Sequence, residues 1–175
     1  MIFRLSQKAS SRIKVSTLAA LPLDENPFAD WSAHVFVADR TQYLILCNTK
    51  SLYSTVMFAK GITSGNEFIT RALGQIREFM EDDGQEFIYH RLIAPSSSMV
   101  RFAKPLNRSI TGSINDLIYD AKVWLTEGDL SPHDVGFKLN DIPFAGLAQE
   151  GEGYRKPRET FRSMSAVTIQ DPARN

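Results

Sequence analysis

The sequence predicts an α+β fold, in which an antiparallel sheet of about five to seven strands carries two long helices on one face, followed by short C-terminal helices. Two observations favour this class. Closely spaced runs of β-branched and aromatic residues fill residues 33–58, and residues 61–84 and 107–127 repeat their apolar residues with the helical period. At 175 residues the chain has the size of one domain. We assign residues 1–164 to that domain and residues 165–175 to a frayed tail.

The N-terminal third is predicted to supply most of the sheet. Ile2–Leu5 alternates apolar and basic residues, as a short strand does, and Lys14–Leu21 is a weaker candidate. Three further runs rich in Val, Ile, Tyr, Phe and Thr are separated by short polar turns: His34–Ala38, Gln42–Cys47 and Leu52–Phe58. Connections this short require antiparallel pairing between neighbouring strands.

The first helix is expected within residues 61–84. Ser64, with Glu67 three residues later, forms a capping-box pattern, and Gly84 stands where a glycine commonly ends a helix. Its apolar face comprises Phe68, Ile69, Ala72, Leu73, Ile76, Phe79 and Met80. After it, Glu86–Ile93 and Met99–Lys104 are predicted to be two strands that pair with each other across a Pro-Ser turn.

The second helical segment, residues 107–127, is the element around which we expect function to be organised. Its apolar positions follow one face of the helix: Ile110, Ile114, Leu117, Ile118, Ala121, Trp124 and Leu125. Gly112 lies almost opposite that face, where a glycine costs about 1 kcal/mol of helix stability relative to alanine. We interpret Gly112 as a place where another molecule approaches the backbone. The alternative is that a segment of the same chain, such as the C-terminal one, packs over it.

The polar face of this segment is therefore the candidate binding surface. Arg108, Ser109 and Thr111 lie at the helix start, where free amides and the helix dipole favour an anion. The full set is Asn107, Arg108, Ser109, Gly112, Ser113, Asn115 and Asp116. The partners considered are another protein, a small anionic ligand, and nucleic acid bound through local basic patches.

Two short helices are expected after this segment. Ser131 with Pro132 at the first helical position opens one that ends near Asn140, and Pro157 opens another that runs through Met164.

The overall charge excludes a strong attraction to polyanions, because Lys+Arg and Asp+Glu both total 20. Basic residues nevertheless gather in residues 1–23 and 154–162, which would form one patch if the two ends met. No run approaches the roughly 18 apolar residues of a membrane helix, and the start lacks a long apolar signal region. The only cysteine, Cys47, lies in an apolar run. We expect a cytoplasmic protein that does not act at a membrane.

The sequence shows no nucleotide-binding loop, no nucleophile elbow and no pair of metal-ligating residues, so we expect neither a metal nor a cofactor. We therefore prefer a non-catalytic binding or regulatory module. The alternative is a metal-independent nuclease or another phosphodiester-processing enzyme. In that case His90 would be the general base beside Tyr89 and Arg91, with Arg91 or Arg108 neutralising phosphate charge. The alternative requires His90, Arg108 and Asp116 to converge on one pocket.

Several segments resemble an uncharacterised bacterial domain family. N-R-S-I-T-G-S-I-N-D, residues 107–116, is similar to the family's N-R-S-x-x-G-S-x-N-D signature. The opening M-I-F-R-L-S-Q-K, the strand pair L-I-L-C-N-T-K-S-L-Y-S and the late L-N-D-I-P-F are similar too, so the resemblance spans most of the chain. The resemblance implies a small single-domain cytoplasmic protein and does not imply any particular activity. Ile142 and Phe144 depart from it, because members often carry a threonine and a small polar residue there.

Overall fold

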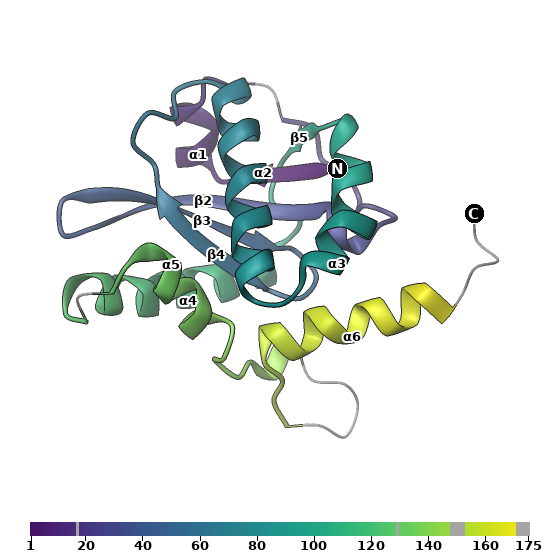
Figure 1. The fold of residues 1–175 in the computed structure, drawn as a ribbon. Coiled ribbons are helices and arrows are strands. Elements are labelled where there is room, and N and C mark those ends of the chain that lie inside the picture. The colour runs from purple at the N-terminus through teal and green to yellow at the C-terminus, as the bar shows by residue number, and fades with distance from the viewer. Residues whose placement is uncertain (17, 129, 148–152, 171–175) are drawn as a thin grey trace.

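A computed structural model describes residues 1–16, 18–128, 130–147 and 153–170. One five-stranded sheet, with the strand order β4-β3-β2-β1-β5, forms the middle layer, and helices lie on both of its faces (Figure 1). The α+β class predicted from the sequence is confirmed. The strands are β1 (Ile2–Leu5), β2 (Asp30–Ala38), β3 (Thr41–Asn48), β4 (Ser54–Phe58) and β5 (Arg101–Ala103).

The meander of β2, β3 and β4 is antiparallel, as predicted. The turn between β2 and β3 is made by Asp39 and Arg40, whose φ angles of 40° and 61° are the left-handed values of a tight hairpin turn. The other edge of the sheet differs from the prediction. Strand β1 pairs in parallel with β2 and with β5, so a wholly antiparallel sheet was wrong. Residues 6–29 and 59–100 are long enough to carry the chain back to the same end of the sheet, which parallel pairing requires.

The helices comprise α1 (Gln7–Arg12), α2 (Gly65–Asp82), α3 (Glu86–Ile88), α4 (Arg108–Thr126), α5 (Pro132–Leu139) and α6 (Pro157–Gln170). Single helical turns are η1 (Pro27–Ala29), η2 (Tyr89–Ile93), η3 (Ala94–Ser98) and η4 (Ala145–Leu147). The predicted caps form: Ser64 accepts from the Glu67 amide at 3.3 Å, and Ser131 accepts from the Asp134 amide at 3.1 Å. Gly84 follows α2 with a φ of +68°, a conformation that glycine adopts without strain.

Residues 86–93 are helical, so the predicted strand there and its pairing with Met99–Lys104 were wrong. In a strand, Ile88, His90 and Leu92 would lie on one face. The structure instead buries Ile88, Tyr89 and Ile93 and exposes His90, which is the spacing of a helix rather than of a strand. Over eight residues rich in aromatic and aliphatic side chains, the two periods are easily confused.

The two long helices lie on opposite faces of the sheet, which corrects the prediction that both share one face. Leu44 and Leu46 of β3 belong to the core under α2, whereas Tyr43, Ile45 and Cys47 belong to the core under α4. A continuous apolar run of this kind is typical of a strand covered on both sides. Helices α1 and α3 lie on the α2 side of the sheet. Helix α5 packs along β4, where the Asn140 side chain bonds to the Ser54 amide and carbonyl at 2.7 and 2.8 Å.

Helix α6 continues to Gln170, beyond the predicted end at Met164, and residues 171–175 lie outside the described part of the chain. Figure 1 places α1 and α6 at opposite ends of the molecule. The basic residues near the two ends of the chain therefore do not form one patch.

A buried ion pair connects β1 to β2. Arg4 donates from Nε and Nη2 to the two carboxylate oxygens of Asp30, at 2.7 Å each, and both side chains are almost fully buried. The guanidinium also donates to the carbonyls of Leu21 and Pro22, at 3.0 and 2.7 Å. A buried charge of this kind is tolerated because its donors find acceptors in fixed positions.

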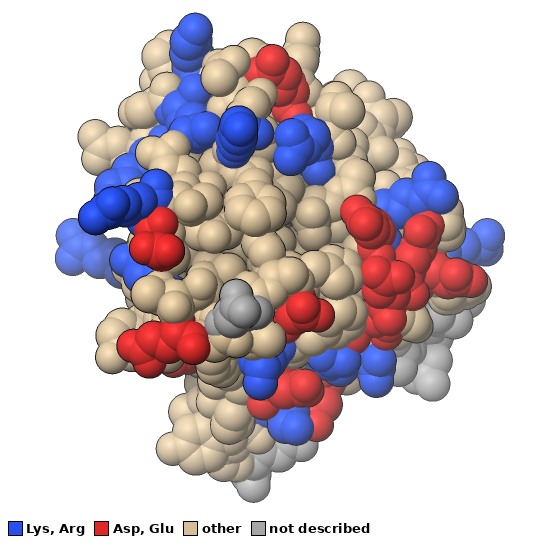
Figure 2. All heavy atoms as spheres, turned by 60° about the vertical axis from the view of Figure 1, so that its left-hand side comes forward, with Lys and Arg blue, Asp and Glu red and all other residues tan. Residues whose placement is uncertain are grey.

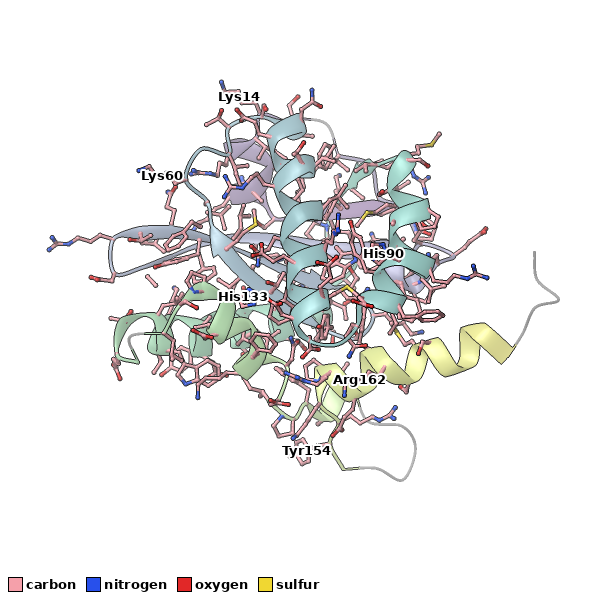
Figure 3. The ribbon with its side chains drawn as sticks, viewed as in Figure 1. Lys14, Lys60, His90, His133, Tyr154 and Arg162 are labelled. Carbon is pink, nitrogen blue, oxygen red and sulfur yellow. The ribbon has the colours of Figure 1, made fainter. Side chains whose placement is uncertain are left out.

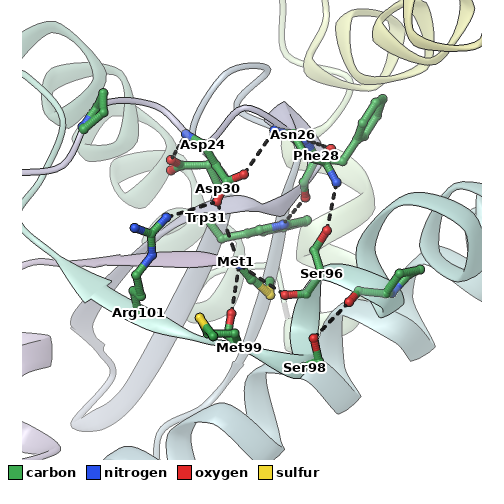
Figure 4. A network of polar contacts seen from close by, with 12 residues as sticks. Met1, Asp24, Asn26, Phe28, Asp30, Trp31, Ser96, Ser98, Met99 and Arg101 are labelled. Atoms are coloured by element: carbon green, nitrogen blue, oxygen red, sulfur yellow. Dashed lines mark hydrogen bonds and ion pairs between the residues drawn. The ribbon is translucent and has the colours of Figure 1, made fainter. Parts of the chain in front are cut away.

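A second polar network connects the start of β1 to the segment after η2 (Figure 4). The Met1 amino group donates to the carbonyls of Ser96 and Met99, at 3.1 and 2.9 Å, and lies 3.8 Å from the Asp24 carboxylate. Asn26 donates from Nδ2 to the Ser96 hydroxyl at 3.1 Å. These bonds hold the helical turns of residues 86–98 against the edge of the sheet. In the described part of the chain, no helix is both long and apolar enough to cross a membrane.

Candidate functional site

The first turn of α4 is closed by its own capping residues. The Asn107 side chain accepts a hydrogen bond from the Ile110 amide at 2.9 Å, and the Thr111 hydroxyl donates to the Asn107 carbonyl at 3.0 Å. An asparagine cap satisfies an amide that an anion would otherwise bind. Asn107 thus stabilises the helix start, and the anion site considered from the sequence would have to compete with it.

Gly112 lies on the open side of α4. A Cβ atom placed on it meets no described atom within 4 Å, so neither α6 nor another described segment packs over it. Arg108 and Asn115 are exposed on the same side of the helix. Tyr119, which the sequence analysis passed over, continues this row at seven residues from Gly112, and its side chain is 70% exposed. A large aromatic ring without cover beside a bare stretch of helix is the most distinctive feature of this face.

The neighbouring row on α4 carries hydroxyls and carboxylates. Ser109 and Asp116 are exposed, while Ser113 and Asp120 are partly covered. The pKa of the Asp120 carboxyl is raised, first by its partial burial and second by the negative charge of Asp116. All seven candidate residues therefore lie on or next to one helix, and the charge of the face is mixed.

The residues of the enzymatic alternative do not assemble with α4. His90, Arg91 and Tyr89 lie in η2 on the α2 side of the sheet, whereas Arg108 belongs to the helix on the other side. The His90 side chain is 56% exposed, and its Nε2 lies 3.6 Å from the Glu81 carboxylate (Figure 3). Tyr89 is buried, and burial is the largest cause of its raised pKa. These residues do not form the pocket that a general base and a phosphate-binding arginine would share.

The other two histidines, His34 and His133, are packed within the fold. His34 on β2 is buried on the α4 side, and burial lowers its pKa from 6.5 to about 4, so the ring is neutral at physiological pH. His133 packs edge-on against Phe79 and Phe137, with ring centroids 5.3 and 5.2 Å away, and its Nε2 lies 3.0 Å from the Asp82 carboxylate. The sequence could not have paired His133 with Asp82, because the two residues are far apart in the chain.

The thiol of Cys47 is also buried. The Ser54 hydroxyl lies 2.9 Å from the sulfur, and burial raises the pKa of the thiol to about 12. A buried thiol of such high pKa is not a nucleophile at physiological pH. No group of three or more His, Cys, Asp or Glu that could hold a metal ion occurs among the described residues.

A cluster at the end of α2 holds α6 in place. Asp83 accepts hydrogen bonds from Tyr53 Oη at 2.7 Å and from Arg158 Nη1 at 2.5 Å, and its side chain is almost fully buried. Burial, followed by the charge of Asp83, raises the pKa of the Tyr53 hydroxyl. The Phe161 ring stacks on Tyr53 with centroids 4.4 Å apart, and Arg162 donates to the Asp83 carbonyl at 3.2 Å (Figure 3). Arg158 Nε is buried without a hydrogen-bond partner among the described residues, 3.5 Å from the Asp141 carboxylate, whereas the Tyr53 hydroxyl and the Asp83 carboxylate bond to each other. The cluster therefore anchors α6 rather than offering a reactive group.

The fold and the site define a small α+β domain with one mixed sheet, helices on both faces and an open, mixed-charge helix face on α4. The chain belongs to the family described as a domain of unknown function, DUF6933, whose sequence model matches residues 2–160. The match covers all five strands, α1 to α5 and the beginning of α6, and it confirms the expectation of an uncharacterised domain family. A search of curated proteins gives no match.

Proposed function

We propose that this protein is a non-catalytic binding module, and that it binds another protein through the outer face of α4, from Asn107 to Asp116 and on to Tyr119. The observation that carries the proposal is the open space around Gly112 together with the uncovered Tyr119 ring on the same side of α4, because a partner can approach the helix backbone there without displacing any described residue and can contact that ring. A glycine in a helix costs about 1 kcal/mol of stability relative to alanine. At Gly112 no contact with another described segment requires a glycine and so explains this cost.

The geometry favours a protein over a small ligand. The outer face of a helix is convex, whereas sites for small molecules are concave and enclose most of the ligand. The exposed Tyr119 ring offers the kind of aromatic anchor that is enriched at the centre of protein interfaces. Nucleic acid is a poorer fit, since the acidic Asp116 and Asp120 lie on the same helix as Arg108. We place the protein in the cytoplasm, in keeping with its single buried thiol.

Photocrosslinking tests this proposal directly. A photoreactive phenylalanine analogue in place of Tyr119 retains an aromatic ring at the C-terminal end of the proposed face. In cells of the native host, we expect it to form an adduct with a second protein. The matched control carries the same analogue in place of Tyr154, which is 68% exposed near the start of α6 (Figure 3). Identical adducts at both positions, or none at Tyr119, would contradict the proposal.

A pair of glycine variants separates binding from stability. Gly74 on α2 is also exposed in mid-helix, and a Cβ added to it would meet nothing within 4 Å, so Gly74→Ala and Gly112→Ala gain the same helix propensity. We expect both variants to be stabilised by up to about 1 kcal/mol. Only Gly112→Ala should weaken binding of the crosslinked partner, measured with purified proteins. Equal binding by the two variants would show that the bare stretch of α4 is not in the interface.

A further inference from the structure

A second surface feature lies between α1 and the outer half of β2, far from the α4 face. It is a hollow of about 620 Å³, which lies within the usual size range of small-molecule sites. Lys8, Ser11 and Arg12 of α1 form one wall, and Gln42 of β3 forms part of the other. The floor is apolar. Val35 is partly exposed and Val37 is 49% exposed, because α1 has only six residues and does not cover this end of the sheet.

Arg12 is held in a fixed position in this hollow by neutral groups. Its Nη1 donates to the Gln42 side-chain oxygen and its Nη2 to the Ala59 carbonyl, the latter at 2.6 Å. Its Nε is buried and has no hydrogen-bond partner in the described part of the chain. The ion pairs found among the described residues involve other cations. The Nε–H is closed off from the hollow, but each Nη nitrogen carries a second N–H beyond the one it donates, so the guanidinium retains donors for an anion.

The surroundings strengthen the positive charge of the hollow. Lys14 and Lys60 are exposed near α1 (Figure 3). Arg40 is exposed at the tip of the β2–β3 hairpin, where the exposed Asp39 beside it offsets its charge. Figure 2 brings this side of the molecule forward and shows Lys and Arg side chains predominating over its upper part, where an acidic side chain also lies, whereas most acidic side chains lie lower down or to the right. A field of this sign raises the local concentration of anions and favours their entry.

We propose that this hollow is a binding site for a small amphiphilic anion, a carboxylate or phosphate monoester on an aliphatic chain. The head group would pair with Arg12 and Lys8, and the chain would cover Val35 and Val37. Single-stranded nucleic acid fits less well, because such sites stack bases on aromatic rings. Phe36, the aromatic residue of the lining, instead stacks its ring on Tyr43 in the core of the α4 side, with centroids 5.6 Å apart.

Calorimetry on the full chain tests this site with monooctyl phosphate as the probe. Inorganic phosphate carries only the anion and 1-octanol only the chain, so we expect monooctyl phosphate to bind at least about tenfold more tightly than either one. Lys8→Gln removes an exposed charge without disturbing the fold and should weaken binding about tenfold. Val37→Thr keeps the shape and strand propensity of the floor while making it polar, and should weaken binding severalfold. Lys104→Gln, an exposed lysine outside the hollow, is the matched control and should bind as the wild type does.

Several results would overturn the proposal. One is that monooctyl phosphate does not bind at millimolar concentration. Another is that the wild type, Lys8→Gln and Val37→Thr bind monooctyl phosphate equally well. Tighter binding of oligodeoxythymidine, weakened equally by Lys8→Gln and Lys60→Gln, would show instead that the whole basic face binds nucleic acid. Arg12→Gln is used only with a parallel thermal melt, because Arg12 also bonds Gln42 and the Ala59 carbonyl.

Discussion

His34 makes the stability of this protein depend on pH in a predictable window. Its folded-state pKa is lowered from 6.5 to about 4, and the cause is burial on the α4 side of β2. Below pH 6.5, His34 of the unfolded chain therefore binds a proton that the buried ring of the folded protein does not bind. Stability is fully retained above this pH and is lost as the pH falls toward about 4. Each pH unit inside the window lowers the free energy of unfolding by about 1.4 kcal/mol, so the complete loss of stability is roughly 3 kcal/mol.

Urea unfolding at a series of pH values from neutral down to about pH 5 measures this effect before most carboxylates titrate. The fluorescence of Trp31 reports unfolding, because its ring is fully buried in the native core. We expect the wild type to lose roughly 2 kcal/mol over this range, since most of the His34 window has then been crossed. His34→Gln cannot take up the proton, so its stability should change little over the same range.

His90→Gln is the control, because its side chain is 56% exposed and its loss should leave the pH dependence of the wild type intact. If His34→Gln lost stability as steeply as the wild type did, the assignment of this pH dependence to the buried ring would be refuted. A flat wild-type profile would refute the burial argument itself.

Two other perturbations test the packing. Phe161→Ala removes a fully buried ring that contacts Tyr53 and Phe28. It should lower the free energy of unfolding in urea by about 3–5 kcal/mol and speed hydrogen exchange in α6. Phe87→Ala, which removes a 62% exposed ring, is the control, and equal losses in the two variants would show that α6 is not anchored in this way. Gly136→Ala would place a Cβ 2.7 Å from the Phe79 ring, so it should destabilise by about 1–3 kcal/mol. A stabilised Gly136→Ala protein would show that the α2–α5 contact can relax.

The candidate surface was predictable because it depends on one helix. The apolar period of residues 107–127 fixes which side of α4 meets the sheet, and therefore which side Gly112 faces. The same period places Tyr119 on the outward side, seven residues after Gly112, although the sequence analysis did not single it out. What the sequence did not reveal is that the Asn107 side chain accepts a hydrogen bond from the Ile110 amide. The hollow beside α1 was not predictable either, since it brings together residues of α1, β2 and β3 and depends on how short α1 is.

The sequence by itself determined the β2–β3–β4 meander, the caps of α2 and α5 and the outward side of α4. Each of these depends on residues only a few positions apart, through turn geometry, capping bonds or the period of burial. The tertiary structure alone decided the parallel pairing of β1, the placement of α2 and α4 on opposite faces, and the helical form of residues 86–93. Those outcomes depend on which apolar surfaces meet across long stretches of chain. The pairings of Arg4 with Asp30 and of Arg158 with Asp83 join residues 26 and 75 positions apart, and no local pattern specifies such contacts.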